Sequence, residues 1–288
     1  MTPEAAPDLQ ALNERIDNLV EKAGDLPAHA RIALRVIQLV NQETTSATHI
    51  AMAISADEIL AARVLRMANN SYYGVPRKIS TLTEATVLLG MDTIRDIAIA
   101  ASCHGLLDRS LPGYALLKGE LWRHSNCCGY AAQLIARRTG YRFTEEALVA
   151  GLLHDIGKVA IGHCLADDFA TIVKTVSDKP ITFANAERAV LGFDHAQVGA
   201  RMAERWDFPP RLISAIRYHH EPGQEVEPGR LTQIVHAADY CCLTLGIGLG
   251  RDGLQYEFQE DIFGFLGLDE AGADTILSAL TDYATVDW

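Results

Sequence analysis

The residues best suited to chemistry in this sequence are histidines that stand beside a carboxylate or beside each other. His154 and Asp155 lie in the largely apolar stretch Gly-Leu-Leu-His-Asp-Ile-Gly-Lys (151–158). A buried His-Asp pair in such surroundings is costly unless it is hydrogen-bonded or bound to a metal ion. His219 and His220 form a second pair. If both lie on one helix, their rings point about 100° apart, which suits two neighbouring ions, or one ion and one substrate, better than a single ion.

Further candidate ligands stand at helical positions elsewhere in the chain. Glu120 and His124 are four residues apart, so they share a face if they lie on one helix. His195 follows the helix-capping residue Asp194 and is expected in the first turn of its helix. Asp239 lies in an apolar stretch and needs a partner, which a bound cation would supply. The candidate metal ligands are Glu120, His124, His154, Asp155, His195, His219, His220 and Asp239.

This mixture of imidazole and carboxylate ligands suits transition metals rather than Ca or Mg, which prefer oxygen ligands. The number of candidates exceeds what one tetrahedral site needs and predicts two divalent ions bridged by Asp155. We expect Fe or Mn first, with Ni, Zn or Co as alternatives. Two such ions lower the pKa of a shared water and hold an oxyanion, as phosphoester hydrolysis requires. The alternative is that each histidine is an ordinary core or surface residue.

Helical signals run through the whole chain, and no segment combines alternating apolar residues with hairpin turns. The sequence therefore predicts an all-α fold, a multi-helix bundle. Apolar stripes, capping residues, prolines and glycines predict the helices. They are Leu9 to Val20; a segment opened by Pro27 with Ile32, Val36, Leu39 and Val40 on one face; helices capped at Ser55, Thr81 and Asp92; Tyr114 to Arg138; Thr144 through Asp155; Asp194 through Trp206; Pro209 to His220; Leu231 to Leu245; and Asp269 to Tyr283.

A break at Leu111-Pro112-Gly113 divides the chain. We expect an N-terminal helical half over residues 1–110, a half that carries the candidate metal site over residues 111–250, and a C-terminal helical tail over residues 251–288. Because no flexible linker separates the two halves, we expect them to pack together.

The composition of the chain argues against some classes of binding partner. The formal net charge is −12, and the acidic side chains are spread along the sequence. This argues against binding to a nucleic acid polymer or to an anionic membrane, because both require clustered Lys and Arg. No apolar run approaches the roughly 18 residues of a membrane span, and the first residues do not resemble a signal peptide. The six cysteines lack C-x-x-C spacing and are expected to be buried free thiols of a cytoplasmic protein.

The order of the candidate ligands resembles that of the HD superfamily of metal phosphohydrolases. The matching residues, in order, are His124, His154-Asp155, His195, His219-His220 and Asp239. The HD-GYP branch is the most similar in ligand order and has a glutamate four residues before the first histidine, where this chain has Glu120. Lys158 matches the lysine of the HD-x-GK segment, and the resemblance implies that it contacts phosphate.

Other segments are similar to HDOD domains of bacterial signalling proteins, namely residues 64–74, 79–92 and 192–200. This resemblance covers roughly residues 27–245. It implies an all-helical fold of the HD/HDOD type in two packed halves and a role in signal transduction. The chain departs from HD-GYP after the histidine pair, where Glu221-Pro222-Gly223 replaces the Gly-Tyr-Pro loop. A cyclic-dinucleotide phosphodiesterase is therefore disfavoured.

Two functions remain open at this point. In the first, the chain is a metal-dependent phosphohydrolase or phosphodiesterase that acts on a phosphorylated small molecule or nucleotide. Asp155 and Lys158 are then the catalytic residues. In the second, the chain is a non-catalytic signalling scaffold. Helical faces around residues 59–105 would then bind a partner protein such as a kinase or a response regulator.

Overall fold

The computed structural model describes residues 9–24, 44–75, 77–165, 168–179, 181–224, 229–248 and 262–286, together with residues 32, 36, 39 and 250. In these parts the chain forms α-helices and short 3₁₀ turns and contains no β-strand. A single β-bridge joins Leu111 and Leu116. The expected all-α fold is confirmed.

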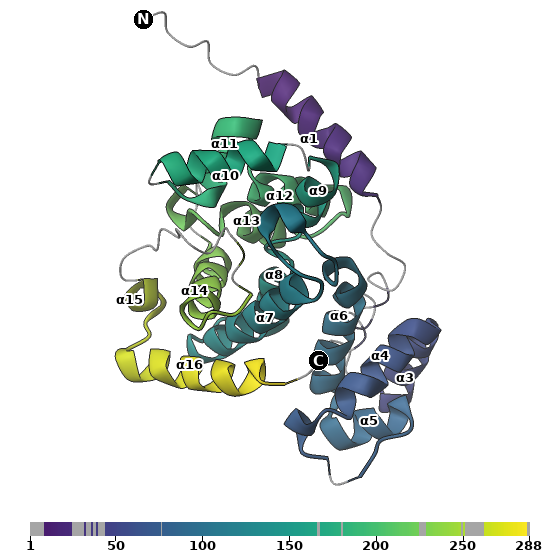
Figure 1. Ribbon diagram of the computed structural model, residues 1–288. Coiled ribbons are helices and arrows are strands. Elements are labelled where there is room, and N and C mark those ends of the chain that lie inside the picture. The colour runs from purple at the N-terminus through teal and green to yellow at the C-terminus, as the bar shows by residue number, and fades with distance from the viewer. Residues whose placement is uncertain are drawn as a thin grey trace, which may run out of the picture.

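Three helices form the middle of the molecule (Figure 1). They are α7 (Glu120–Arg138), α8 (Thr144–Leu153) and α14 (Arg230–Thr244). α8 and α14 both pack against α7 and also contact each other. Small buried residues on α7, such as Ala131, Ala132 and Ala136, leave room for these neighbours. The three helices therefore lie close enough to bring side chains from distant parts of the sequence together.

A second group of helices covers one end of this core (Figure 1). Its members are α9 (Gly157–Cys164), α10 (Phe169–Asp178), α11 (Phe183–Leu191), α12 (His195–Arg205) and α13 (Pro210–Tyr218). α12 packs between α9 and α13, and α10 pairs with α11. The N-terminal helix α1 (Leu9–Ala23) also packs here, against α9 and α12. Asp194 caps α12, as the sequence predicts, and the structure shows that Gln197 completes a capping box with it.

The helices of the N-terminal half other than α1 form a lobe beside α7 (Figure 1). It consists of α3 (Ala47–Ser55), α4 (Glu58–Ala68), the 3₁₀ turn η1 (Ser71–Tyr73), α5 (Leu82–Leu89) and α6 (Met91–Leu107). α6 connects this lobe to α7 and α8. The helix expected to open at Pro27 falls largely outside the described residues, as do Pro27 and Val40 themselves. Of its expected apolar face, Ile32, Val36 and Leu39 are helical, and Val36 is buried.

The C-terminal part contributes α15 (Ile262–Leu266), which packs on α14, and α16 (Glu270–Ala284), which lies along α7. Two further 3₁₀ turns are η2 (Pro112–Tyr114) and η4 (Pro222–Gln224). The buried apolar side chains form one continuous cluster from Ile16 in α1 to Tyr283 in α16. The halves on either side of residue 111 thus share one core, whereas the exact division into residues 1–110, 111–250 and 251–288 stays a prediction.

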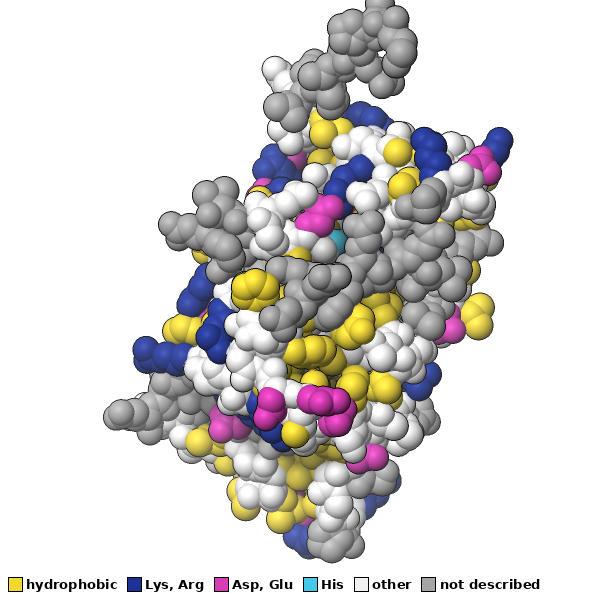
Figure 2. Space-filling view, turned by 90° about the vertical axis from the view of Figure 1, so that its left-hand side faces the viewer, with side chains coloured by type: hydrophobic (Ala, Val, Ile, Leu, Met, Phe, Trp, Pro, Cys, Tyr) yellow, Lys and Arg dark blue, Asp and Glu magenta, His cyan; other side chains and the backbone are white. Residues whose placement is uncertain are grey.

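The described residues bear on two further predictions, the state of the cysteines and the presence of a membrane span. Cys103, Cys127, Cys128, Cys241 and Cys242 are buried free thiols, as predicted. Among the described residues, no helix has both the length and the apolar character that crossing a bilayer requires. On the face that Figure 2 shows, basic and acidic side chains are interspersed.

Two of the expected helix caps are wrong. Ser55 is the last residue of α3, and Asp57 caps α4 by accepting a hydrogen bond from the Leu60 N–H. Asp92 lies in the first turn of α6, which begins one residue earlier. Both segments contain several polar residues that could serve as caps, and the local sequence does not rank them.

The start expected for the longest helix is also wrong. α7 begins at Glu120 and not at Tyr114, which belongs to η2. Between them, Ala115 and Gly119 have positive φ angles of 55° and 89°, and this left-handed backbone interrupts the helix. Glu120 is consequently the first helical residue of α7 rather than a residue in its second turn.

Two glycines allow the helices of the core to approach closely. A Cβ on Gly151 of α8 would lie 2.7 Å from the backbone oxygen of Cys128 on α7. A Cβ on Gly157 of α9 would collide with the backbone oxygen of His195 on α12. Any side chain at either position would push the helices apart, because packed interiors have no space for extra atoms. These crossings therefore set the spacing between the helices that carry the candidate ligands.

The variant Gly151→Ala should destabilise the protein, because its Cβ would collide with the backbone of α7. We expect a loss of about 1–3 kcal/mol in the free energy of unfolding, measured by denaturant titration. The matched control is Gly223→Ala in η4, where a Cβ would meet nothing within 4 Å. Equal stability of the two variants would contradict the close approach of α7 and α8.

Candidate metal centre

Seven of the eight predicted ligands converge where α7, α8, α12, α13 and α14 meet. His124 comes from α7, His154 and Asp155 from the turn after α8, His195 from the start of α12, His219 and His220 from the residues after α13, and Asp239 from α14. All except His220 are at most 4% exposed. So many buried ionisable groups require one another or a bound ion as partners.

The first group of ligand atoms consists of His124, His154 and Asp239. The Nε2 atom of His124 lies 3.4 Å from Nε2 of His154 and 3.1 Å from Oδ1 of Asp239. The distance from His154 Nε2 to the same Asp239 oxygen is 3.7 Å. Two imidazoles and one carboxylate at this spacing form a pocket that one transition-metal ion fits.

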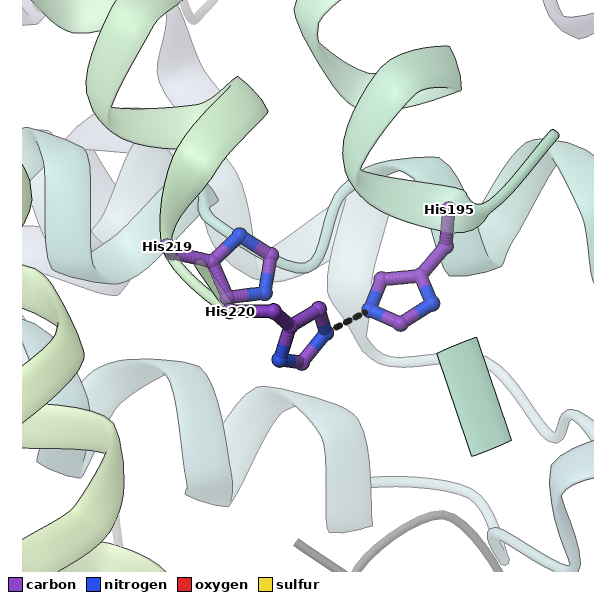
Figure 3. A group of neighbouring side chains, drawn as sticks. All are labelled: His195, His219 and His220. Carbon is purple, nitrogen blue, oxygen red and sulfur yellow. Dashed lines mark hydrogen bonds between the residues drawn. The ribbon is translucent and has the colours of Figure 1, made fainter. Parts of the chain in front are cut away.

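The second group consists of His195, His219 and His220 (Figure 3). The Nε2 atoms of His195 and His220 lie 2.8 Å apart, and the ring centres of His219 and His220 are 4.0 Å apart. His219 also forms a third group with His154 and Asp155, and that group leaves out His220. Whether the histidine pair serves one ion or two therefore stays a prediction.

Asp155 stands between the two groups and offers one oxygen to each. Its Oδ2 atom lies 3.4 Å from Nε2 of His154 and 3.6 Å from Nε2 of His124. Its Oδ1 atom lies 3.3 Å from Nε2 of His195 and 3.8 Å from Nε2 of His219. This is the arrangement that a carboxylate bridging two ions needs.

The other ring nitrogen, Nδ1, of four of these histidines contacts an acceptor. The pairs are His124 with Ile247 O at 3.0 Å, His154 with Gly151 O at 2.7 Å, His219 with Ile216 O at 2.8 Å, and His195 with Glu187 Oε2 at 2.7 Å. A carbonyl or carboxylate oxygen only accepts, so each Nδ1 carries the proton. Each neutral ring then presents the lone pair of Nε2 to the centre, as in metal-binding histidines.

Several atoms of the centre have no hydrogen-bond partner. They are Oδ1 of Asp155, Nε2 of His219 and Oδ1 of Asp239, all fully buried. Buried polar atoms without partners are rare in folded proteins and call for an explanation. When the histidine rings are neutral, their Nε2 atoms and the carboxylate oxygens are all acceptors. They lie close together but cannot form hydrogen bonds with one another. A cation satisfies all of them at once, and the residues therefore fit the metal ions that their types predict.

The centre also favours positive charge by its electrostatics. Burial disfavours the charged form of His195, but the carboxylate of Glu187 outweighs it and raises the pKa of His195 to about 10. Burial likewise opposes charge on His124, yet the pKa of that ring is raised by Asp239. The pKa of Asp155 lies well below its usual range, because the charges of His154 and Lys158 outweigh its burial. Divalent cations supply the same positive charge that these protons would.

Sequence reasoning missed Glu187 of α11. This side chain is fully buried and accepts hydrogen bonds from the Nδ1–H and the backbone N–H of His195, at 2.7 and 3.0 Å. Its other oxygen accepts a hydrogen bond from the hydroxyl of Tyr114. A signal was present, because Glu187 lies between the apolar residues Ala186 and Leu191 of α11. Its partner His195, however, lies on the next helix, and only the fold brings them together.

The structure does not bring the predicted ligand Glu120 into either group. As the first residue of α7, it turns back and accepts a hydrogen bond from the Leu117 N–H at 2.6 Å. The predicted catalytic residue Lys158 is buried and pairs with Oδ2 of Asp155. His236 of α14 donates a hydrogen bond through Nδ1 to the carbonyl oxygen of His219 and thereby supports the backbone of the histidine pair.

A pocket of about 250 Å³ has His220 in its wall. Arg188 and Arg217 also line it. Arg188 forms ion pairs with Asp194 and Glu221 at 2.7 and 2.8 Å. On the face drawn in Figure 2, histidine side chains are visible only in a small area, in keeping with the burial of the centre. The pocket gives a molecule from solution a route to the second group.

The sequence matches the model of the HDOD domain over residues 26–222. The chain belongs to the HDOD family. The match spans the N-terminal half from residue 26 onward and all the predicted ligands except Asp239. The resemblance to HDOD domains inferred from residues 64–74, 79–92 and 192–200 is thus confirmed.

Solved structures extend the comparison across the HDOD chain. An HDOD domain protein of unknown function from Geobacter sulfurreducens is 28% identical, with a TM-score of 0.71, and the match covers 95% of this chain and 98% of that one. A protein of Shewanella amazonensis SB2B, proposed to be a phosphohydrolase, is 26% identical with a TM-score of 0.70 over 94% and 93% of the two chains.

An uncharacterised protein of Treponema pallidum is 21% identical to this HDOD chain over 204 residues. The match covers 70% of this chain but only 39% of that protein. The chain therefore spans less than half the length of this relative.

The substitution Glu187→Gln tests whether the partner of His195 matters for metal binding. An amide accepts a weaker hydrogen bond and no longer balances charge on His195, so we expect metal affinity to fall about 10- to 100-fold. Competition with a chromogenic chelator measures this affinity. Glu120→Gln is the matched control and should leave it unchanged. A larger effect of Glu120→Gln would restore Glu120 to the ligand set.

Proposed function

We propose that this HDOD protein is a metal-dependent phosphohydrolase of bacterial signal transduction that holds two divalent transition-metal ions. The observation that carries the proposal is Asp155, which presents one oxygen to each of two histidine groups while one of these oxygens has no hydrogen-bond partner. A bridging carboxylate between two ligand sets is the typical arrangement of two-ion hydrolytic centres.

The first ion would be held by His124, His154, Asp239 and Oδ2 of Asp155, and the second by His195, His219, His220 and Oδ1 of Asp155. When bound, divalent ions supply Lewis acidity that stabilises negative charge on phosphate and lowers the pKa of water. The histidine-rich ligand set favours Fe or Mn, with Ni, Zn or Co as alternatives.

The remaining residues would bind and orient a substrate. Lys158 lies beside Oδ2 of Asp155, where its positive charge can offset negative charge that develops on a phosphate. Arg188 and Arg217 of the pocket at His220 are already paired with carboxylates, Arg188 with Asp194 and Glu221 and Arg217 with Glu204, so a phosphate that enters the pocket has to compete with these ion pairs for their N–H groups. A pocket of this size, on a chain of net charge −12, favours a phosphorylated small molecule or nucleotide over a nucleic acid polymer.

Metal content is the direct test of this function. The purified wild-type protein should carry close to two transition-metal ions per chain by mass spectrometry and should hydrolyse a generic phosphoester such as bis-p-nitrophenyl phosphate. Asp155→Ala should lose metal and turnover together, because the bridging oxygens are gone. The control Asp178→Ala replaces an exposed aspartate of α10 and should retain both.

Two outcomes would contradict the enzymatic function. Turnover that survives complete loss of metal would show that the centre is not its source. A protein that stays metal-free after anaerobic loading with Fe or Mn would leave the histidine groups without the proposed role.

A second candidate function, a non-catalytic signalling scaffold, is favoured by one separate observation. Large apolar side chains are exposed on the helices of the N-terminal half: Met52 is 68%, Ile59 61% and Val87 70% exposed. Several such residues in one region are typical of surfaces that bind other proteins. A kinase or a response regulator is the kind of partner that a signalling role implies.

Charged substitutions on this surface separate the two functions. Ile59→Glu and Val87→Glu should leave stability within about 0.5 kcal/mol, because both positions are exposed. If the protein is a scaffold, these variants abolish its signalling response in the source organism, whereas Asp155→Ala does not. If the protein acts through phosphoester turnover, Asp155→Ala abolishes the signalling response, whereas Ile59→Glu and Val87→Glu do not.

A further inference from the structure

A cavity of about 230 Å³ lies where the N-terminal half, α7 and α16 meet. Four tyrosines line it, together with a small number of polar side chains. We call it the tyrosine pocket and define it by Tyr72, Tyr73, Asn126, Tyr130, Gln133 and Tyr283. None of these residues belongs to the metal centre or to the pocket at His220. The tyrosine pocket is therefore a separate site.

The aromatic walls of the tyrosine pocket are fixed by contacts among the rings. Tyr130 and Tyr283 stack with ring centres 4.0 Å apart and an angle of 8° between their planes. Tyr72 stands edge-on to both, with centres 6.2 and 5.3 Å away, and its hydroxyl lies 3.0 Å from that of Tyr130. The faces that Tyr130 and Tyr283 turn toward each other are filled by this stack, so a ligand meets the remaining ring faces and ring edges, and such contacts favour a flat ligand.

Asn126 brings an unsatisfied polar group into the tyrosine pocket. The residue is 1% exposed, and its Oδ1 atom accepts a hydrogen bond from the Tyr283 hydroxyl at 3.3 Å. Its Nδ2 group is fully buried and has no hydrogen-bond partner. Even if the amide were turned over, one of its two polar atoms would still lack a partner. A ligand with a complementary hydrogen-bonding edge would satisfy it.

The charges that line the tyrosine pocket balance each other. Asp96 accepts hydrogen bonds from Arg95 at 2.9 Å and from Gln133 at 2.8 Å, and Arg137 lies 3.7 Å from its second oxygen. The carboxylate is thus already paired and leaves no excess charge for an ion to neutralise. This favours a neutral ligand over a phosphate or an ammonium group.

The positions on α7 show that the tyrosine pocket is built into the helix. Asn126, Tyr130, Gln133 and Arg137 follow one another at intervals of four, three and four residues, so they share one face. His124 precedes Asn126 by two residues and therefore points to the opposite face, toward the metal centre. One helix separates the two sites.

We infer that the tyrosine pocket binds a small, neutral, planar heterocycle with hydrogen-bonding groups on its edge, of the nucleobase class. Its volume is below the roughly 300–1,000 Å³ of pockets for drug-sized ligands, which suits a single ring system. Stacking on aromatic side chains and hydrogen bonding to the base edge are the means by which proteins hold unpaired bases. The inference stands on the tyrosine pocket alone and does not depend on catalysis at the metal centre.

Calorimetric titration of the full chain with free adenine, guanine, cytosine and uracil tests the inference. At least one base should bind at millimolar concentration or below. Asn126→Ala should weaken that binding roughly tenfold, as expected for the loss of one buried hydrogen bond. Tyr72→Ala should also weaken it. Because Tyr72 is 39% exposed and lies in the short turn η1, this variant keeps the test open if Asn126→Ala fails to fold.

Two controls make the result specific. Tyr141→Ala changes a tyrosine outside the tyrosine pocket and should leave binding unchanged, as should Asp155→Ala in the metal centre. Binding of none of the four bases would overturn the inference. Binding that is lost in Asp155→Ala but kept in Tyr72→Ala would also overturn it, because the base would then occupy the metal centre.

Discussion

The buried carboxylate of Asp155 is the constraint on which the centre of this protein depends. A charged group that is 1% exposed is costly in a protein interior unless it is surrounded by compensating charge. Lys158 supplies one positive charge, and histidines on both sides of the carboxylate supply positions for more. The helices that carry these partners come from distant parts of the sequence, so the fold and the electrostatic balance at Asp155 require each other.

Close backbone packing makes that balance possible. At Gly151 and Gly157 the helices approach so closely that backbone touches backbone, and each crossing lies within six residues of Asp155. The histidine rings are then oriented by carbonyl oxygens of the same helices, as at His154 and His219. Backbone groups move little in a packed core, so the Nε2 atoms are aimed before any ion arrives. Preorganisation of this kind reduces the cost of ordering the ligands on binding.

The sequence predicted better which candidate residues lie together than how their side chains are arranged, for reasons that can be traced to particular residues. The apolar surroundings of Asp239 and the capping residue Asp194 before His195 are local signals, and Asp239 is buried and His195 begins α12, as those signals predict. Glu120 shares α7 with His124, but as the first residue of that helix it turns back and accepts a hydrogen bond from the Leu117 N–H, a local contact that the four-residue spacing does not reveal. Glu187 could not be assigned, since its partner His195 lies across a turn whose geometry only the folded core determines.

Helix α7 shows how one element can serve two sites without conflict. Its face toward α8 and α14 carries His124, and its face toward α6 and α16 carries Asn126 and Tyr130. Burial on both faces explains why this helix lacks a wide polar side.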